Sequence, residues 1–185
     1  MPILGIMASS TSGANAVGDY ESIATTTVGS GGSTNVTFSS IPATYKHLQL
    51  RLNVRTDRAV AVDSYSLEFN GISSNQYVAH FVTGSGSAAS AGNELNANSG
   101  TCAYLSGNSA SANLFGGAIT DILDYTSTSK YKVCRSLGGT DQNGSGNIMF
   151  ASMMWQNTAA ITSIKFLCGG TGFTQYSSFA LYGIK

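Results

Sequence analysis

The chain carries few residues whose types and spacing could support catalysis. It has two histidines, His47 and His80, and a catalytic base must lie beside the group that it deprotonates. A strained nucleophilic serine is marked by G-x-S-x-G. Neither 84–86 nor 144–146, which both read Gly-Ser-Gly, completes that pattern or leads into a helical segment. We therefore interpret His47 as a surface or interface side chain and predict that the protein is not an enzyme.

The acidic residues show no pattern that fits a shared substrate or a metal ion. Asp121 and Asp124 lie in a segment with strand character and point to opposite faces, which does not suit a carboxylate pair. We expect Asp124 to hold the following turn through side-chain-to-backbone bonds. Residues 141–147 resemble the start of a calcium loop, but Ser152 stands where the bidentate Glu belongs. The sequence therefore predicts a turn there.

The three cysteines, Cys102, Cys134 and Cys168, are widely spaced and form no C-x-x-C pair. Zinc and redox motifs depend on such close pairs, so neither is supported. An odd number cannot pair completely within one chain, and each cysteine lies in a strand-like segment. We predict buried free thiols, no metal and no cofactor.

Aromatic side chains are better candidates for recognition, because exposed rings can stack on sugars. The alternative is that they pack in the core, with each hydroxyl finding a partner, and we favour this for most of them. Two segments that we interpret as long exposed loops, 84–100 and 138–146, are where binding would be expected. The aromatic candidates are Tyr65, Tyr77, Tyr104, Tyr125, Tyr131, Trp155 and Tyr176.

The composition predicts one β-rich domain with an unusually neutral surface. Of the 185 residues, 10% are charged, which is far below the usual share of roughly a quarter. The formal net charge is zero, which argues against nucleic acid or an anionic membrane as a partner. Ser, Thr, Asn and Gly supply the polarity instead. Such surfaces are typical of extracellular and virion proteins and of surfaces that pack against copies of themselves.

The N-terminus does not read as a targeting signal. It carries no positively charged side chain, and its apolar run is too short for a secretory signal followed by a cleavage site. No segment reaches the length that spans a bilayer. We expect synthesis in a host cytoplasm and no transmembrane segment.

The segment 46–55 is the clearest structural signal in the chain. Leu48, Leu50, Leu52 and Val54 alternate with polar residues, and side chains of a β-strand alternate between faces. This spacing predicts a central strand with its apolar face in the core. The opposite face is expected to form an interface row that meets a neighbouring subunit or a partner protein. That row comprises His47, Gln49, Arg51, Asn53 and Arg55.

The remaining strand-like segments are short and separated by Gly-rich turns, with no convincing helix. Segment 147–155 is nearly all apolar and is expected to be a strand buried on both faces. The series predicts an all-β fold, an antiparallel β-sandwich of the jelly-roll type with about eight to ten strands. We assign the sandwich to residues 20–185.

Residues 1–19 are expected to form an extended N-terminal arm that anchors the protein to a partner. The stretch from Ala8 to Gly18 has small side chains and no periodicity. An apolar tip on such a stalk is costly to leave in water, so we expect it to dock on a neighbour. The tip comprises Pro2, Ile3, Leu4, Ile6 and Met7.

Several segments together resemble small virion-associated proteins of tailed bacteriophages, notably phages of cyanobacteria and other aquatic bacteria. They are MPILGIMASS (1–10), YESIA (20–24), YKHLQLR (45–51), DILDY (121–125) and FALYGIK (179–185). The resemblance covers nearly the whole chain and is weakest over 84–100. It implies a non-enzymatic particle component, a homotrimer held by its N-terminal arm to other virion proteins.

Three functions are consistent with these expectations. The first is a tail-associated fibre or adhesin module, anchored by the arm and presenting its loops to a host-surface glycan. The second is a capsid cement or decoration protein that reinforces the head lattice. The third is a glycan-active enzyme of the tailspike type, which the missing carboxylate pair and the short chain disfavour.

Overall fold

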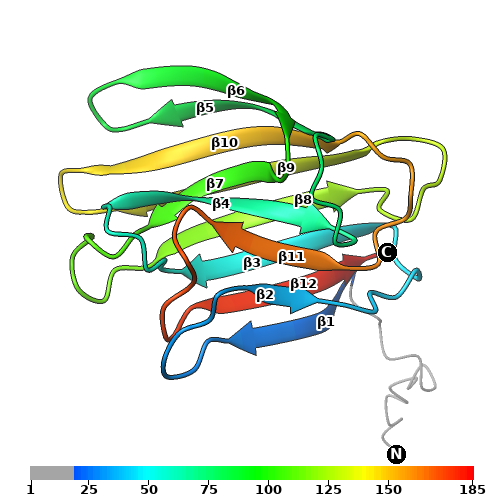
Figure 1. Ribbon diagram of the computed structural model, residues 1–185, viewed down its shortest axis with the longest axis horizontal. Helices are drawn as coiled ribbons and strands as arrows, with labels where there is room; N and C mark the ends of the chain where they lie inside the picture. Colours follow the sequence, from blue (N-terminus) through cyan, green and yellow to red (C-terminus); the bar gives the residue numbers. More distant parts are fainter. Residues whose placement is uncertain (1–18) are drawn as a thin grey trace, which may run out of the picture.

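Figure 1 shows a computed structural model in which residues 19–185 are described and form two antiparallel sheets packed face to face. This range contains twelve strands and no helix, so the predicted all-β sandwich is confirmed, with more strands than expected. The expected arm, including Pro2, Ile3, Leu4, Ile6 and Met7, lies outside the described residues except for Asp19.

The two sheets differ in width. The large sheet has eight strands, which lie in the order β1 (Tyr20–Thr27), β12 (Ser178–Ile184), β3 (His47–Val54), β8 (Gly116–Leu123), β9 (Lys132–Asp141), β10 (Gly146–Trp155), β5 (Tyr77–Gly84) and β6 (Ala89–Ala97). The small sheet has four strands, which lie in the order β2 (Val36–Phe38), β11 (Ile164–Cys168), β4 (Val62–Phe69) and β7 (Gly100–Ser106).

The strand pairing is that of a jelly roll, in which nested antiparallel pairs alternate between two sheets. β2 pairs with β11 and β4 with β7 in the small sheet, whereas β3 pairs with β8 and β5 with β6 in the large one. β9 and β10 widen the large sheet between β8 and β5, and β1 and β12 extend its other end. The jelly-roll-like fold predicted from the sequence is thus confirmed.

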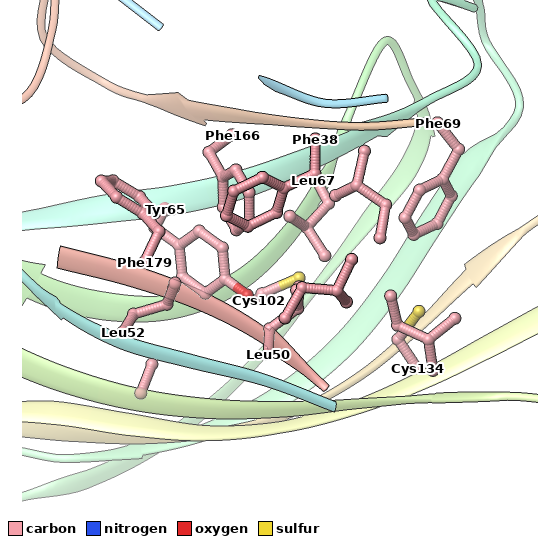
Figure 2. Packing of buried hydrophobic residues seen from close by; sticks show 14 of the residues in the cluster. Phe38, Leu50, Leu52, Tyr65, Leu67, Phe69, Cys102, Cys134, Phe166 and Phe179 are labelled. Carbon is pink, nitrogen blue, oxygen red and sulfur yellow. The ribbon is translucent and has the colours of Figure 1, made fainter. Parts of the chain in front are cut away.

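The core forms between the inner faces of the two sheets (Figure 2). Leu48, Leu50, Leu52 and Val54 of β3 are all buried, as their alternation predicts. Aromatic rings connect the layers: the centroids of Phe166 on β11 and Phe179 on β12 are 4.9 Å apart. Further pairs of this kind run through the core, including Phe38 with Phe166 and Phe69 with Trp155.

A chain of hydroxyl groups crosses this apolar core. The Tyr65 hydroxyl lies 2.6 Å from the Thr120 hydroxyl, which lies 2.7 Å from that of Ser136. Ser136 also donates to the Ile119 carbonyl at 3.2 Å. Buried polar groups are costly without partners, so this chain lets one tyrosine of the small sheet bury its ring against two strands of the large sheet. Burial raises the pKa of Tyr65 well above its usual value.

The edge strands of both sheets are short or interrupted. Ser22 and Ala24 of β1 face consecutive residues of β12, so β1 carries one extra residue, a β-bulge. The same irregularity occurs in β6 against β5 and in β7 against β4. The remaining edge strand, β2, has three residues.

Segment 84–100 is not the long exposed loop that the sequence suggested, because it contains β6, which pairs with β5 over most of its length. An edge strand is held by backbone hydrogen bonds to one neighbour and needs little apolar bulk. The small side chains of β6 are mostly exposed and carry no strand periodicity. The prediction was therefore wrong for residues 89–97.

Segment 138–146 is also mostly strand rather than loop. β9 continues to Asp141 and β10 begins at Gly146, so only a short turn separates them. A side chain at Gly138 would begin 2.7 Å from the Ala103 Cβ and 2.8 Å from the Ala118 Cβ. Glycine is required at this position because side chains of the neighbouring strands β7 and β8 approach closely, and not because the backbone turns.

Strand β10 is not buried on both faces, contrary to expectation. Met149, Met153 and Trp155 point into the core, whereas Ile148 and Phe150 on the other face are 55% and 50% exposed. The sequence has apolar residues on both sides of this strand, so it carries no alternation to show which face is covered. The candidate site lies on this uncovered apolar face.

We expect Leu50→Ala to lower the free energy of unfolding by about 2–5 kcal/mol, because a fully buried side chain leaves a cavity between the sheets. The matched control on the same strand is Asn53→Ala, which changes an exposed side chain and should stay within about 0.5 kcal/mol. Urea titrations of both variants measure the difference. Equal effects would show that β3 does not have one core face.

Candidate functional site

A row of exposed apolar side chains crosses the outer face of the large sheet. Strand register aligns Ile119 of β8, Leu137 of β9, Phe150 of β10 and Val82 of β5. Their exposed fractions are 49%, 51%, 50% and 54%. We call these four residues the apolar ladder. Isolated exposed apolar residues are ordinary, but a contiguous row of four on adjacent strands marks an interaction surface.

A hollow runs beside the ladder, where three of the next four aligned positions are glycines. Gly117 pairs with Gly139, which pairs with Ile148, which pairs with Gly84. The hollow has a volume of about 1330 Å³ and is bordered by the turns 85–87 and 141–146. We call it the glycine trough. Three missing side chains lower the floor of the sheet next to the raised ladder.

Polar side chains border the ladder on its other side. Gln49, Asp121, Arg135, Ser152 and His80 occupy successive aligned positions on β3, β8, β9, β10 and β5. The Gln49 side-chain amide donates to Asp121 Oδ1 at 2.8 Å. An apolar strip with a polar rim has the anatomy of a protein–protein interface.

Four members of the interface row predicted from the sequence stand on this outer face. His47 and Asn53 lie at the two ends of β3, and Arg51 is aligned with Ile119 of the ladder. His47 is partly buried, and its Nδ1 accepts the backbone N–H of Asp124 at 2.9 Å. His47 thus holds the end of β8, whereas Asn53 is exposed.

Arg51 is held between two aromatic rings at the end of the ladder. Its guanidinium carbon lies 4.9 Å from the ring centroid of Tyr182 and 5.5 Å from that of Tyr20. Its Nε donates to Gln49 Oε1 at 2.8 Å. These cation–π contacts fix an exposed charge in one position, which favours a defined partner over general solvation.

Arg55, the fifth predicted member, does not stand in the row, because β3 ends at Val54 and the Arg55 side chain turns to the loop between β7 and β8. Its guanidinium donates four hydrogen bonds of 2.7–3.3 Å to backbone carbonyls. The acceptors belong to Asn108, Ala110, Ser111 and Leu114. Arg55 therefore stabilises segment 108–114 and is not available to a neighbouring subunit.

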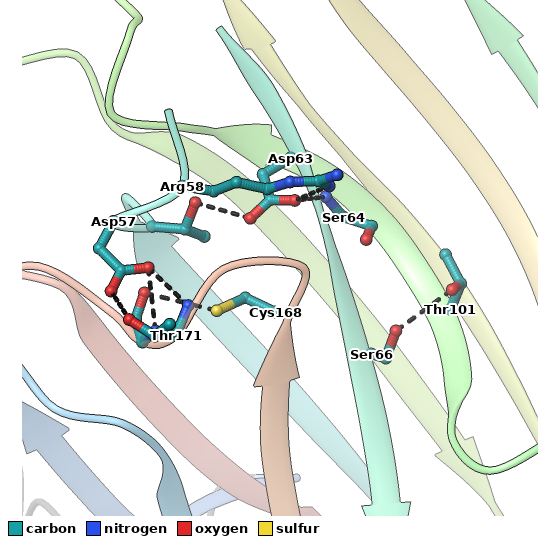
Figure 3. Close-up of polar contacts among 10 residues, drawn as sticks. Asp57, Arg58, Asp63, Ser64, Ser66, Thr101, Cys168 and Thr171 are labelled. Carbon is teal, nitrogen blue, oxygen red and sulfur yellow. Dashed lines mark hydrogen bonds and ion pairs between the residues drawn. The ribbon is translucent and has the colours of Figure 1, made fainter. Parts of the chain in front are cut away.

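The acidic residues of the 57–63 segment hold loops in place (Figure 3). Asp57 Oδ1 accepts the backbone N–H groups of Thr171 at 2.8 Å and Gly172 at 3.0 Å, and the Thr171 hydroxyl donates to Asp57 Oδ2. The pKa of Asp57 lies below its usual value, mainly because the Thr171 hydroxyl donates to the carboxylate; the two backbone N–H groups lower it further. The buried Asp63 pairs with Arg58 at 3.0 Å and accepts the Thr56 hydroxyl at 2.7 Å.

The other acidic candidates also have structural contacts. Asp124 contacts Lys130 directly and lies 3.8 Å from Lys46, and these pairs replace the side-chain-to-backbone bond that the sequence predicted. The Lys130 contact is the main cause of the lowered pKa of Asp124. Asp141 accepts the backbone N–H of Asn143 at 3.1 Å, so the predicted turn is confirmed.

The three thiols are free, as predicted. Cys102 and Cys134 are fully buried and Cys168 is partly buried. Burial raises the pKa of Cys102 to about 12 and that of Cys168 to about 11, which keeps both protonated at neutral pH. Within residues 19–185 no three His, Cys, Asp or Glu side chains come together in a way that could hold a metal ion. The same range contains no helix suited to crossing a membrane.

Most of the aromatic candidates belong to the core. Tyr65, Tyr77, Tyr125 and Trp155 are fully buried, so packing explains them rather than sugar stacking. The tyrosine hydroxyls find partners: that of Tyr77 accepts the Phe69 N–H at 2.8 Å and donates to the Ile72 carbonyl at 3.0 Å. The buried Trp155 Nε1 has no hydrogen-bond partner among the described residues. The exposed aromatic candidates Tyr131 and Tyr176 lie in loops, and Tyr104 is partly exposed on β7.

Sequence reasoning missed the ladder and the trough. Both consist of residues from four strands that become neighbours only through register, and none of their segments has a distinctive motif. Comparisons with protein-family models, with known proteins and with solved structures found no match for this chain.

We expect Arg55→Ala to lower the free energy of unfolding by about 2 kcal/mol, because four carbonyls lose a charged donor. Arg55→Lys should recover only part of this, since a lysine offers three donors from one point. Arg135→Ala, which changes an exposed arginine of β9, is the control and should be near neutral. Thermal melts and amide exchange over 108–114 measure the effect. An unchanged loop in Arg55→Ala would contradict this assignment.

Proposed function

We propose that this chain is a non-enzymatic structural protein of a bacteriophage virion, a tail-associated fibre or adhesin module that assembles as a homotrimer. The observation that carries the proposal is the apolar ladder beside the glycine trough on the uncovered face of the large sheet. The resemblance of the sequence to virion-associated phage proteins and the low surface charge support the same setting. Residues 1–19 supply the anchor to other virion proteins.

The occupant that fits this face is a second copy of the chain. A raised apolar row and a hollow lie parallel and adjacent on one surface, so the ladder of one copy can fill the trough of the next. A contact between two different patches is heterologous and produces a ring when the rotation closes. Three faces turned toward a common axis would each use both patches.

The charges on this face are compatible with self-association. Arg51 and Arg135 carry two positive charges and Asp121 carries one negative charge, while the chain has no formal net charge. Like-charge repulsion between copies is therefore small. The ladder also gains from burial, because each half-exposed apolar side chain loses its remaining contact with water.

A non-enzymatic role is supported by the way in which the acidic residues are used. Asp57, Asp63 and Asp124 hold loops or pair with neighbouring basic residues, and Asp121 is bonded to Gln49. A glycosidase requires two carboxyl groups that flank one bond. Sustained release of reducing ends from host polysaccharide by the purified protein would overturn this part of the proposal.

Capsid decoration remains the alternative placement, since the same face could cover a lattice. The number of copies per virion separates the two. A tail component is present in a few to a few dozen copies, whereas a lattice protein is present in hundreds. Quantitative mass spectrometry of purified particles gives this number, and labelled particles viewed by electron microscopy give the location.

We expect the double variant Leu137→Glu/Phe150→Glu to be monomeric and folded, because two half-exposed ladder residues become charged without disturbing the core. Gly117→Leu should have the same effect from the other side, by filling the trough. A side chain at Gly117 would meet its nearest atom at 3.8 Å, so the subunit itself has room for it. Light scattering gives the oligomeric state and circular dichroism the fold.

Mixing a ladder variant with the trough variant provides a sharper test. Phe150→Glu alone changes a ladder residue that does not line the hollow, so it retains an open trough, and Gly117→Leu retains an intact ladder. Their mixture should form a heterodimer that cannot close. Tyr131→Glu, which changes an equally exposed aromatic side chain in a loop, should leave the oligomer intact. Unchanged oligomers in both ladder and trough variants would refute assembly through this face.

Deleting residues 1–18 should leave a folded sandwich that is no longer incorporated into particles. The first described strand begins at Tyr20, so the deletion leaves all of the described strands intact. Complementation of a phage that lacks the gene, followed by immunoblotting of purified particles, measures incorporation. Full occupancy by the shortened protein would contradict the anchor.

A further inference from the structure

The hairpin formed by β5 and β6 passes the free edge of the small sheet and leaves a second hollow there. This pocket has a volume of about 460 Å³, within the usual range for small-ligand sites. It lies between Phe81 of β5 and Glu94 of β6 on one side and Ser64 of β4 and Tyr104 of β7 on the other. It is separate from the ladder, although Asn147 borders both the pocket and the trough.

The polar groups of the pocket have unused bonding capacity. Asn147 Oδ1 is buried and has no hydrogen-bond partner among the described residues. Arg58 uses only Nη1, on Asp63, and its side chain is 49% exposed. An unpaired buried acceptor carries a free-energy cost, which a ligand hydroxyl could remove.

The acid of the pocket is fixed in position. Glu94 Oε1 accepts the Thr101 hydroxyl at 2.7 Å, and Oε2 accepts the Thr101 backbone N–H at 3.3 Å. Each carboxylate oxygen can accept a further bond, so Glu94 can also receive ligand hydroxyls. A side chain that is already ordered loses little entropy when a ligand binds.

These groups select a ligand class. Arg58 is already paired with Asp63, and Glu94 adds a second carboxylate, so these groups disfavour an anionic ligand such as a phosphate. Vicinal hydroxyls both donate and accept, and they match a carboxylate, a guanidinium and an amide together. The rings of Phe81 and Tyr104 offer apolar surface for the C–H face of a sugar ring. We propose that this pocket binds a neutral saccharide unit of a surface polysaccharide.

The position of the pocket suits an adhesin. Asp19 is the first described residue, and Tyr20 of β1 is aligned with Ile184 of β12, which is aligned with His47 at the start of β3. The pocket lies at the other end of the strands, near the start of β4, as the course of these strands in Figure 1 shows. A protein anchored through residues 1–19 would therefore hold the pocket away from its anchor. This orientation rests on the proposed function, whereas the pocket chemistry does not.

The test uses the full chain and two sets of probes. One set is an array of neutral bacterial surface oligosaccharides; the other is free glucose, galactose and N-acetylglucosamine, followed by saturation-transfer NMR. Binding to array members with much weaker binding of the free sugars indicates a polysaccharide source, whereas binding of free sugars alone would overturn that assignment.

Glu94→Gln, which keeps the side-chain shape, and Arg58→Gln, which removes the guanidinium, should each weaken binding about tenfold or more, because a charged hydrogen-bonding partner is lost. Leu137→Glu/Phe150→Glu should keep the per-subunit affinity, since the ladder lies outside the pocket. Absence of binding to every probe, or binding that neither pocket variant changes, would overturn the inference. Either result leaves the oligomer tests independent, so failure of the pocket and failure of the assembly proposal are distinguishable.

Discussion

The structure depends on one constraint: a sheet of eight strands shares its core with a sheet of only four. The small sheet cannot cover the whole inner face of the large one, so the β5–β6 hairpin extends past the edge strand β7 and leaves the proposed saccharide pocket between them. Nothing within residues 19–185 covers the outer face of the large sheet, where half-exposed apolar side chains remain. Both candidate sites therefore follow from the unequal widths of the two layers.

Much of the fold could be predicted because strand periodicity is a local property. Leu48, Leu50 and Leu52 show their core face in the sequence alone. The predictions for segments 89–97 and 147–155 were wrong for opposite reasons. The first segment is an edge strand with too few apolar side chains to show an alternation, and the second has apolar residues on both faces. In both segments the sequence lacks the alternation of apolar and polar residues that marks a strand, although the backbone pairs with its neighbours.

The candidate site was less predictable, because it is defined by register. Arg51 could be placed on the outer face from its position in the strand, but its alignment with Ile119 depends on how β3 meets β8. Arg55 has the same parity and still leaves the row, since the strand ends one residue earlier. The glycines of the trough resemble turn residues in sequence, and only pairing shows that Gly117 and Gly139 are neighbours in a sheet.

The bulges in β1, β6 and β7, together with the shortness of β2, have a consequence for how copies can meet. An open strand edge invites another chain to continue the sheet, and such growth has no natural end. Here each edge strand is bent by an extra residue or is only three residues long, so long regular pairing between edges is suppressed. Association is left to the faces, where contacts can close on themselves. The irregular edges thus favour assemblies of fixed size over fibres, as the proposed particle component would require at high local concentration.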